Sequence, residues 1–369
     1  MSPTVHIVGA GLLGTSLGLA LRRSGWAVSL SDRDPAAQRL AADLGAGTLG
    51  WPASTPDLVV IAVPPSAFEA VAAEIGRLGL DATVTDLCSV KSVIAEAIER
   101  VGLADRFVGG HPMAGRERSG PHGAQADLFD GRPWVLCPTS SVSVERVNTV
   151  TEMVTECGAQ PVQMTAAAHD AAVARVSHAP QVVASLLAAQ LVDADPQQLE
   201  LAGQGVRDTV RIAASDSSLW SQILAANAGP VADVLTGLDS ELQGMIALLR
   251  KIESAASKSD KSINQETDSS LVTRAVEESL ERGRAGHGLI PGKHGAPAVA
   301  YEVVPVVIPD EPGALARLFV AAGEAGVNIE DISIEHSPGQ PVGLVELSVV
   351  PGVSPDLIRA LTGLGWSVH

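Results

Sequence analysis

Short apolar runs alternate with longer amphipathic stretches along the first half of the chain. The runs are bounded by glycine, proline or charged residues and lie at residues 4–8, 26–31, 57–63, 83–86, 107–110 and 134–137. Continuous apolar runs of this length are typical of strands buried on both faces of a parallel sheet. Helical stretches such as residues 66–78 and 91–101 lie between them. The pattern predicts a doubly wound α/β domain over residues 1–165.

The pattern changes near residue 165. From there to about residue 252 the sequence is rich in alanine and leucine at helical spacing, with no strand pattern. We expect an all-α domain over residues 166–285 that pairs with a second copy of itself, which makes the protein a homodimer. Within it, the polar residues 253–270 predict an exposed loop, followed by a helix over about 270–283.

The last part of the chain returns to short strands. A glycine-rich linker is expected over residues 286–300, and residues 301–369 show the order strand, helix, strand, strand, helix, strand. This βαββαβ order is typical of a ferredoxin-like domain.

Composition and charge narrow the function classes. Hydrophobic residues make up 46% of the chain and aromatic residues only 3%, so we expect a large aliphatic core. The net charge of −17, without a dense Lys/Arg cluster, argues against nucleic-acid binding. Three cysteines without paired spacing argue against a disulfide framework or a zinc site, so we expect no bound metal. The pattern contains neither a signal peptide nor a membrane span, and the expected location is the cytoplasm.

A glycine motif follows the first predicted strand. Gly9 permits a tight turn, Gly11 allows the backbone to approach a pyrophosphate, and Gly14 allows the helix to pack closely on the strand. Asp32 ends the next strand, where a carboxylate would bind ribose hydroxyls and repel a 2′-phosphate, which favours NAD over NADP; the neighbouring Arg33 weakens that preference. The predicted cofactor-binding residues are Gly9, Gly11, Leu12, Leu13, Gly14, Asp32 and Val63.

A second group of polar residues follows later strands. The segment from Asp86 to Ser92 and the loop around His111 both come directly after strands, at the sheet edge where α/β proteins bind ligands. A histidine there suits a general base near neutral pH. On the loop chemistry alone, a histidine that only caps the loop remains an alternative.

These segments resemble the signatures of prephenate and arogenate dehydrogenases. The likeness rests on Thr-Asp-Leu-Cys-Ser-Val-Lys-Ser and Gly-Gly-His-Pro-Met-Ala-Gly-Arg-Glu-Arg-Ser-Gly, and it extends over about residues 4–295. The resemblance implies an NAD-dependent oxidative decarboxylation in tyrosine synthesis, with prephenate or arogenate as substrate. It implies that His111 is the general base at the substrate's C4 hydroxyl and that Ser89 orients His111 and touches the same hydroxyl.

The resemblance also implies a set of substrate-binding residues. Arg211 would bind a carboxylate bidentately, Glu117 and Asp208 would form an ionic network around Arg211, and His178 would face the substrate. An ordinary surface arginine and a core histidine remain alternatives for Arg211 and His178. Gln181 stands where some prephenate-using relatives have a second histidine, which leaves the preference between prephenate and arogenate open. A nonenzymatic sensor of NAD and amino acids is the alternative from another class.

The C-terminal segment resembles an ACT domain. The resemblance rests on Ile-Pro-Asp-Glu-Pro-Gly-Ala-Leu at residues 308–315 and on Gly-Val-Asn-Ile at residues 326–329. It implies a regulatory site for an aromatic amino acid, with Gly313 close to the ligand and Asn328 hydrogen-bonded to it. A dimerisation domain without a ligand is the alternative.

Overall fold

The computed structural model describes residues 2–115, 120–256, 263–291, 301–336 and 341–369. The chain divides into two compact units, Met1–Gln243 and Gly244–His369.

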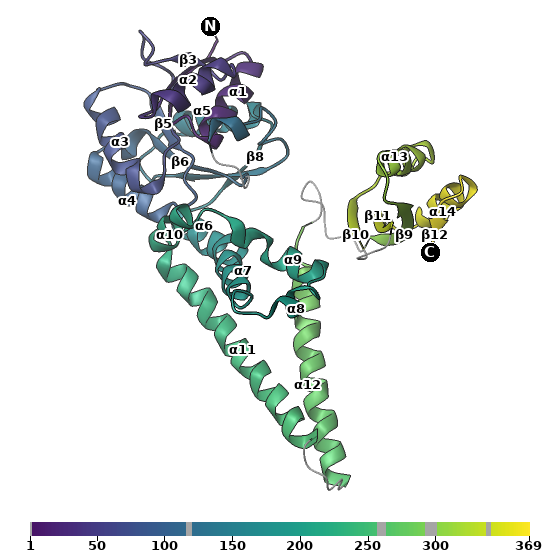
Figure 1. The fold of residues 1–369 in the computed structure, drawn as a ribbon. Coiled ribbons are helices and arrows are strands. Elements are labelled where there is room, and N and C mark those ends of the chain that lie inside the picture. Colours follow the sequence, from purple (N-terminus) through teal and green to yellow (C-terminus); the bar gives the residue numbers. More distant parts are fainter. Residues whose placement is uncertain (1, 116–119, 257–262, 292–300, 337–340) are drawn as a thin grey trace. The chain divides into compact units, whose positions relative to one another are not determined.

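An eight-stranded sheet organises the first unit (Figure 1). Its strands are ordered β3-β2-β1-β4-β5-β6-β7-β8, and only β6 and β7 run antiparallel to each other. The strands are β1 (Thr4–Val8), β2 (Ala27–Ser31), β3 (Thr48–Leu49), β4 (Leu58–Ile61), β5 (Thr83–Asp86), β6 (Phe107–Pro112), β7 (Pro133–Pro138) and β8 (Gln160–Gln163). The helices that connect them are α1 (Leu12–Arg23), α2 (Pro35–Asp43), α3 (Pro65–Arg77), α4 (Ser92–Val101) and α5 (Val144–Glu156), with 3-10 turns at η1 (Ala104–Arg106) and η2 (Pro121–Gly123).

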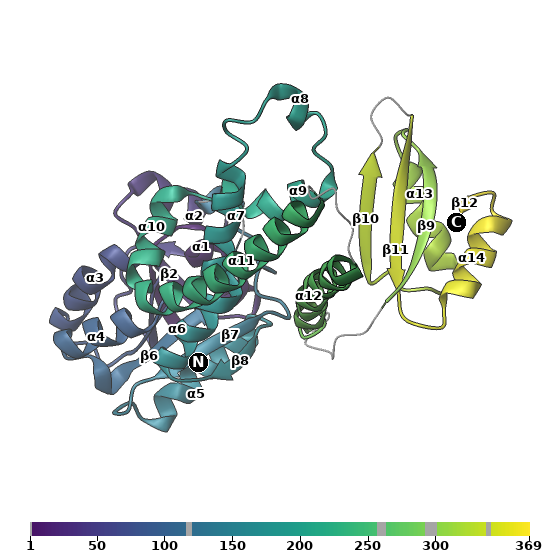
Figure 2. The same ribbon diagram turned by 90° about the horizontal axis from the view of Figure 1, so that it is seen from below.

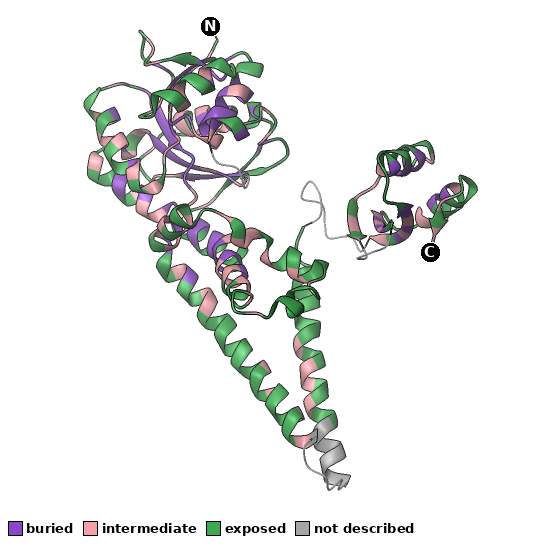
Figure 3. Cartoon of the chain, in the orientation of Figure 1, coloured by how far each residue is buried: buried purple, intermediate pink, exposed green. Residues whose placement is uncertain are grey.

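Alternation along the strands produces two cores, one on each face of the sheet. Leu58 and Val60 pack with α1 and α5 on one face, while Val59 and Ile61 pack with α3 and α4 on the other. Figure 3 shows this burial as a continuous purple band through the sheet. Because successive residues of a strand point to opposite faces, a fully apolar strand is what two covered faces require.

The predicted strands of the first domain are present in a mainly parallel sheet, and the antiparallel pair of β6 and β7 is a feature that the pattern did not predict. The connection from β6 to β7 contains no long helix in its described residues, and an antiparallel neighbour needs no crossover helix. The prediction also missed β8, whose sequence Gln-Pro-Val-Gln has no apolar run and is exposed throughout at the sheet edge. The position of such a strand is determined by its pairing with the neighbouring strand and not by its own hydrophobic pattern.

Helices follow the sheet, as the alanine-rich pattern predicted. They are α6 (Ala166–Val173), the π-helical turn η3 (Ala174–His178), α7 (Ala179–Ala189), α8 (Pro196–Leu199), α9 (Gln204–Val210), the 3-10 turn η4 (Arg211–Ala214), α10 (Ser217–Ala226) and α11 (Ala228–Ala256). Asp216 caps α10 by accepting a hydrogen bond from the Leu219 amide at 2.8 Å. No helix within the described ranges is both long and apolar enough to span a bilayer.

The exposed loop expected at residues 253–270 is largely helical. Helix α11 runs to Ala256 and α12 (Ile263–His287) begins seven residues later, so most of that segment and the first residues of the expected linker belong to helices. A polar sequence does not exclude a helix, because i,i+3 and i,i+4 ion pairs such as Arg274–Glu278 support one in water. The remainder of the linker, residues 292–300, lies outside the described residues.

The predicted βαββαβ order is present at the C-terminus. The elements are β9 (Glu302–Pro309), α13 (Ala314–Glu324), β10 (Asp331–His336), β11 (Val342–Val349), α14 (Ser354–Gly363) and β12 (Ser367–Val368), and the antiparallel sheet has the order β10-β11-β9-β12. Figure 2 shows α13 and α14 on one side of this sheet. Val304, Val306 and Ile308 of β9 pack with both helices in one core.

The packing of α1 makes a testable prediction about stability. A Cβ on Gly18 would meet the backbone oxygen of Ala46 at 2.4 Å, so Gly18→Ala must push the helix from the loop before β3. We expect a loss of about 1–3 kcal/mol in the free energy of unfolding, measured by urea denaturation. Gly76→Ala is the matched control, since a Cβ there has contacts of 3.7 Å or longer and alanine favours the helix. Equal stability of wild type and Gly18→Ala would contradict this packing.

Candidate active site

The glycine turn between β1 and α1 is as tight as the motif predicted. Gly9 has φ +116°, and a Cβ there would meet the Ala62 carbonyl oxygen at 2.2 Å. A Cβ on Gly14 would meet the Gly9 oxygen at 2.0 Å, so α1 packs directly on the turn. A Cβ on Gly11 would meet nothing within 4 Å, which leaves the N-terminus of α1 open to a ligand.

Asp32 fixes the same turn from the end of β2. Its Oδ2 accepts a hydrogen bond from the Ala10 amide at 2.6 Å, and its Oδ1 accepts one from the Asp34 amide at 2.8 Å. A carboxylate oxygen has two lone pairs, so both oxygens keep acceptor capacity for a hydroxyl group.

A cleft of about 950 Å³ opens above this turn. Of the residues predicted to bind the cofactor, Gly9, Gly11, Asp32 and Val63 line this cleft. Leu12, Leu13 and Gly14 do not line it. Leu13 packs against the core and Gly14 against the turn, so their contribution to binding stays a prediction.

The second part of the site lies where β6 ends beside β5. A Cβ on Gly110 would meet the Asp86 backbone oxygen at 2.5 Å, so a glycine must precede His111 if the two strands are to approach this closely. The Gly110 amide donates to Asp86 Oδ1 at 2.9 Å. His111 is thereby held at the end of β6, the position that the loop pattern predicted.

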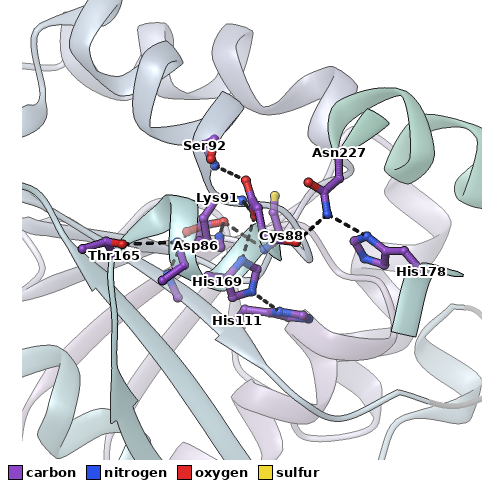
Figure 4. A network of polar contacts seen from close by, with 12 residues as sticks. Asp86, Cys88, Lys91, Ser92, His111, Thr165, His169, His178 and Asn227 are labelled. Atoms are coloured by element: carbon purple, nitrogen blue, oxygen red, sulfur yellow. Dashed lines mark hydrogen bonds and ion pairs between the residues drawn. The ribbon is translucent and has the colours of Figure 1, made fainter. Parts of the chain in front are cut away.

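His111 is the first residue of a hydrogen-bonded chain that continues through His169 (Figure 4) to Asp170. His111 Nδ1 lies 2.8 Å from His169 Nε2, and His169 Nδ1 lies 2.8 Å from Asp170 Oδ1. His169 and Asp170 come from α6, so the first helix after the sheet completes the environment of a residue on the sheet.

Asp170 is almost fully buried, with 2% of its surface exposed. Burial by itself raises the pKa of its carboxyl, but hydrogen bonds from His169 and from the Ser92 and Lys91 amides outweigh burial and lower the pKa to about 2. Asp170 is therefore ionised at neutral pH and accepts the Nδ1–H of His169.

The ionised carboxylate determines where the protons of both histidines lie. When His169 donates from Nδ1 and accepts at Nε2, His111 donates its Nδ1–H to His169. His111 then keeps a lone pair on its own Nε2, which is the form that accepts a proton from a substrate.

Neighbouring groups keep His111 neutral. Burial lowers the pKa of His111 well below 6.5, and positive charge on His169, Lys91 and His178 would lower it further, against the opposing effect of Asp170. At neutral pH the unprotonated ring is available.

His178 is held on the other side of Asp170. Asn227 donates one amide hydrogen to the Asp170 backbone oxygen at 2.9 Å and the other to His178 Nδ1 at 3.0 Å. His178 therefore carries its proton on Nε2 as a potential donor. The ring packs edge to face on Trp220, with centroids 5.8 Å apart.

Lys91 lies at the start of α4 and is buried. Only 1% of it is exposed, and its ammonium pairs with Asp86, whose Oδ2 also accepts from the Cys88 amide at 2.9 Å. A buried charge needs such a partner. The loop after β5 is thus bound by Asp86 at one end and by Asp170 at the other.

The sequence prediction missed His169, Asp170 and Asn227. One signal was present: His-Asp interrupts an alanine-rich helix, and a polar pair at that position is unusual unless it has a buried partner. The partner itself, His111, lies 58 residues away in the sequence and could not be identified from spacing.

The structure places the other predicted site residues as follows. The described residues provide no hydrogen bond to the Ser89 hydroxyl, and the partner of His111 Nδ1 is His169. Gln181 is buried and donates to Ser185 Oγ at 3.3 Å, while Asp208 accepts from Gln204 at 2.7 Å. Arg211 is exposed in η4, which packs against α7. Glu117 lies outside the described residues.

The C-terminal domain has a small hollow of about 110 Å³. Gly313, with φ +86°, lines it together with residues of β9, β10 and β11. Asn328 does not line it, and its amide donates to Glu330 Oε1 at 2.6 Å.

Comparison with known proteins assigns the first two domains. Residues 17–163 match the family model for the prephenate dehydrogenase nucleotide-binding domain, and residues 165–261 match the prephenate dehydrogenase dimerization domain. The chain is 38% identical to the probable prephenate dehydrogenase NovF of Streptomyces niveus over 99% of both chains. The chain belongs to the prephenate dehydrogenase family.

Solved structures of family members share this fold. Prephenate dehydrogenase from A. aeolicus, in complex with hydroxyphenyl propionate and NAD+, is 30% identical with a TM-score of 0.65, covering 77% of this chain and 99% of that one. Synechocystis arogenate dehydrogenase is 26% identical with a TM-score of 0.62, covering 76% and 99%.

The lowered pKa of Asp170 makes a prediction about stability and pH. A carboxyl whose pKa falls from 3.8 to about 2 on folding stabilises the fold above pH 4, and that stabilisation is lost as the pH falls through 2. We expect Asp170→Asn to lower the free energy of unfolding by roughly 2 kcal/mol at pH 7.

Urea denaturation between pH 7 and pH 2 measures this difference, which should narrow below pH 4. Asp193→Asn, at an exposed position, is the control and should change stability little. If the free energies of unfolding of wild type and Asp170→Asn differed by the same amount at every pH from 7 to 2, the carboxylate charge would not be what stabilises the site.

Proposed function

We propose that this protein is an NAD-dependent prephenate dehydrogenase, which converts prephenate to 4-hydroxyphenylpyruvate in tyrosine synthesis. The observation that carries the proposal is the chain from Asp170 through His169 to His111, which leaves an unprotonated Nε2 at the sheet edge. Family membership and the nucleotide cleft support the same activity.

NAD fits the residues of the cleft. The open N-terminus of α1 at Gly11 suits the pyrophosphate, and the carboxylate of Asp32 suits the ribose hydroxyls. The same carboxylate disfavours the 2′-phosphate of NADP, although Arg33 also lines the cleft. When bound, NAD supplies the hydride acceptor.

The chemistry requires one proton acceptor and an environment that positions the ring. His111 Nε2 takes the proton of the C4 hydroxyl while C4 becomes a carbonyl carbon and its hydrogen leaves as hydride. The bond from C1 to the carboxylate then breaks, carbon dioxide leaves, and the electron pair makes the ring aromatic. The positive charge that His111 acquires is compensated through His169 by the carboxylate of Asp170.

Three residues are proposed to recognise the substrate. His178 offers an Nε2–H, Ser89 a hydroxyl group and Arg211 a guanidinium group for a carboxylate. Asp208 and Glu117 are proposed to order Arg211.

Arogenate dehydrogenase activity is the second candidate. Gln181 is an uncharged, buried residue on α7, and arogenate carries an amino-acid side chain where prephenate carries a keto acid. Kinetics with both substrates and both cofactors decide between the candidates.

The protein is proposed to act as a homodimer. Helix α11 exposes Leu238, Leu242, Ile246 and Leu249, whose spacing places them on one face. An apolar stripe of this kind is typical of a helix that packs on another chain.

The C-terminal domain is proposed to be an ACT domain that senses an aromatic amino acid. The βαββαβ order and the left-handed Gly313 at the start of α13 support this assignment. Its hollow is smaller than the 300–1,000 Å³ or so usual for ligand sites, so a second copy would have to complete it.

The first test of the function is a substitution of the base. His111→Asn should lower kcat by roughly 10²–10⁴, the usual contribution of a general base, while NAD binding remains near wild type. NADH absorbance at 340 nm measures turnover with prephenate, and calorimetry measures NAD binding. The exposed His287→Asn is the control. Wild-type turnover in His111→Asn would remove His111 from the mechanism.

The second test concerns regulation. A chain truncated after Ala296 should remain an active dehydrogenase and lose part or all of its response to tyrosine, because an effector acts only by preferring one state of the enzyme. Initial rates with and without tyrosine measure the response. Undiminished inhibition of the truncated enzyme would place the tyrosine site outside the C-terminal domain.

A further inference from the structure

A histidine in the middle of β1 has a defined set of partners. His6 is fully buried, its Nδ1 lies 2.8 Å from Ser29 Oγ, and its Nε2 lies 3.0 Å from Ser31 Oγ. Ser29 donates to the Val5 carbonyl oxygen, so His6 donates from Nδ1 and accepts at Nε2. Burial lowers the pKa of His6 to about 4, and the ring is neutral at physiological pH.

Trp51 covers this histidine. The two rings stack with centroids 3.8 Å apart and an angle of 26° between their planes. The Gly50 amide donates to the Leu30 oxygen at 2.9 Å, which fixes the start of the segment that carries Trp51. The indole is thus held by backbone pairing on one side and by ring stacking on the other.

Trp51 is nevertheless 40% exposed, whereas the other four tryptophans are buried or half-buried. Its indole is part of the wall of the nucleotide cleft, together with Asp32, Arg33, Val71 and Ile75. A large aromatic surface that is rigidly held and open to a cleft is typical of a ligand-stacking position.

The order of the strands indicates which part of the cofactor this wall meets. The glycine turn follows β1, Asp32 follows β2, and Trp51 follows β3, and these strands are neighbours in that order (Figure 1). In NAD the pyrophosphate, the adenosine ribose and the adenine also follow one another in that order. If the turn takes the pyrophosphate and Asp32 the ribose, the adenine lies toward Trp51.

We propose that Trp51, supported by His6 beneath it, forms an aromatic wall for the adenine of NAD. This inference rests on the proposed function, since it presumes that NAD occupies the cleft. It adds a binding residue outside the glycine motif and the acidic residue.

Calorimetry with NAD and with ADP-ribose, which lacks the nicotinamide, tests the proposal. Trp51→Ala should weaken both ligands roughly tenfold, the usual scale of base stacking, and Trp51→Phe should weaken them less. Leu49→Ala is the matched control, because Leu49 is a neighbouring exposed residue that does not line the cleft. Leu49→Ala should leave the affinity for both ligands at the wild-type level.

Fluorescence provides an independent readout. ADP-ribose should quench part of the tryptophan emission of the wild-type enzyme, and that part should be absent from Trp51→Phe. This comparison decides the question even if Trp51→Ala fails to fold.

Two results would overturn the inference: unchanged ADP-ribose affinity in the folded variants, or a parallel loss of affinity for prephenate that indicates a structural role. Wild-type enzyme that binds neither NAD nor ADP-ribose would overturn the cofactor assignment itself, and the role of Trp51 with it.

Discussion

The carboxylate of Asp170 is the group on which the arrangement of the site depends. It accepts hydrogen bonds from the Lys91 and Ser92 amides and from His169, and so binds the loop after β5 and the chain of histidines at one point. Because its oxygens are buried, each hydrogen bond is made in a low-dielectric environment where an unpaired partner would be costly. The position of the loop and the tautomer of His111 therefore depend on the same charge.

This arrangement joins two structural elements of different kinds. The sheet supplies His111 and the loop from Asp86 to Lys91, while the helices that follow supply His169, Asp170, His178 and Asn227. Neither element alone sets the proton positions on His111. Asn227 extends the network because its one amide group donates hydrogen bonds to both the Asp170 carbonyl oxygen and the His178 ring. Figure 4 shows His111, His169, His178 and Asn227 close together.

The cofactor cleft is organised by backbone contacts. Gly9 and Gly14 permit approaches that a Cβ would forbid, and Asp32 ties the turn to β2. The glycine turn therefore lines the cleft with backbone, and the bulky indole of Trp51 lines it as well. The contrast fits the chemistry of a dinucleotide, in which a charged linker meets backbone amides and an apolar base meets an aromatic surface.

Local signals in the sequence determined most of the fold. Apolar runs located β1, β2, β4, β5, β6 and β7, and the glycine spacing located the turn before α1, because burial and backbone freedom act within a few residues. His111 was identified for the same reason, as a histidine in a glycine-rich loop at the end of a strand. The edge strand β8 and the start of α12 could not be located from the sequence, since neither has an apolar pattern of its own.

Only the tertiary structure decided that Lys91 is buried against Asp86, that His169 lies beside His111, and that Trp51 stacks on His6. Each of these contacts joins side chains that are brought together only by folding, so periodicity and spacing cannot predict them.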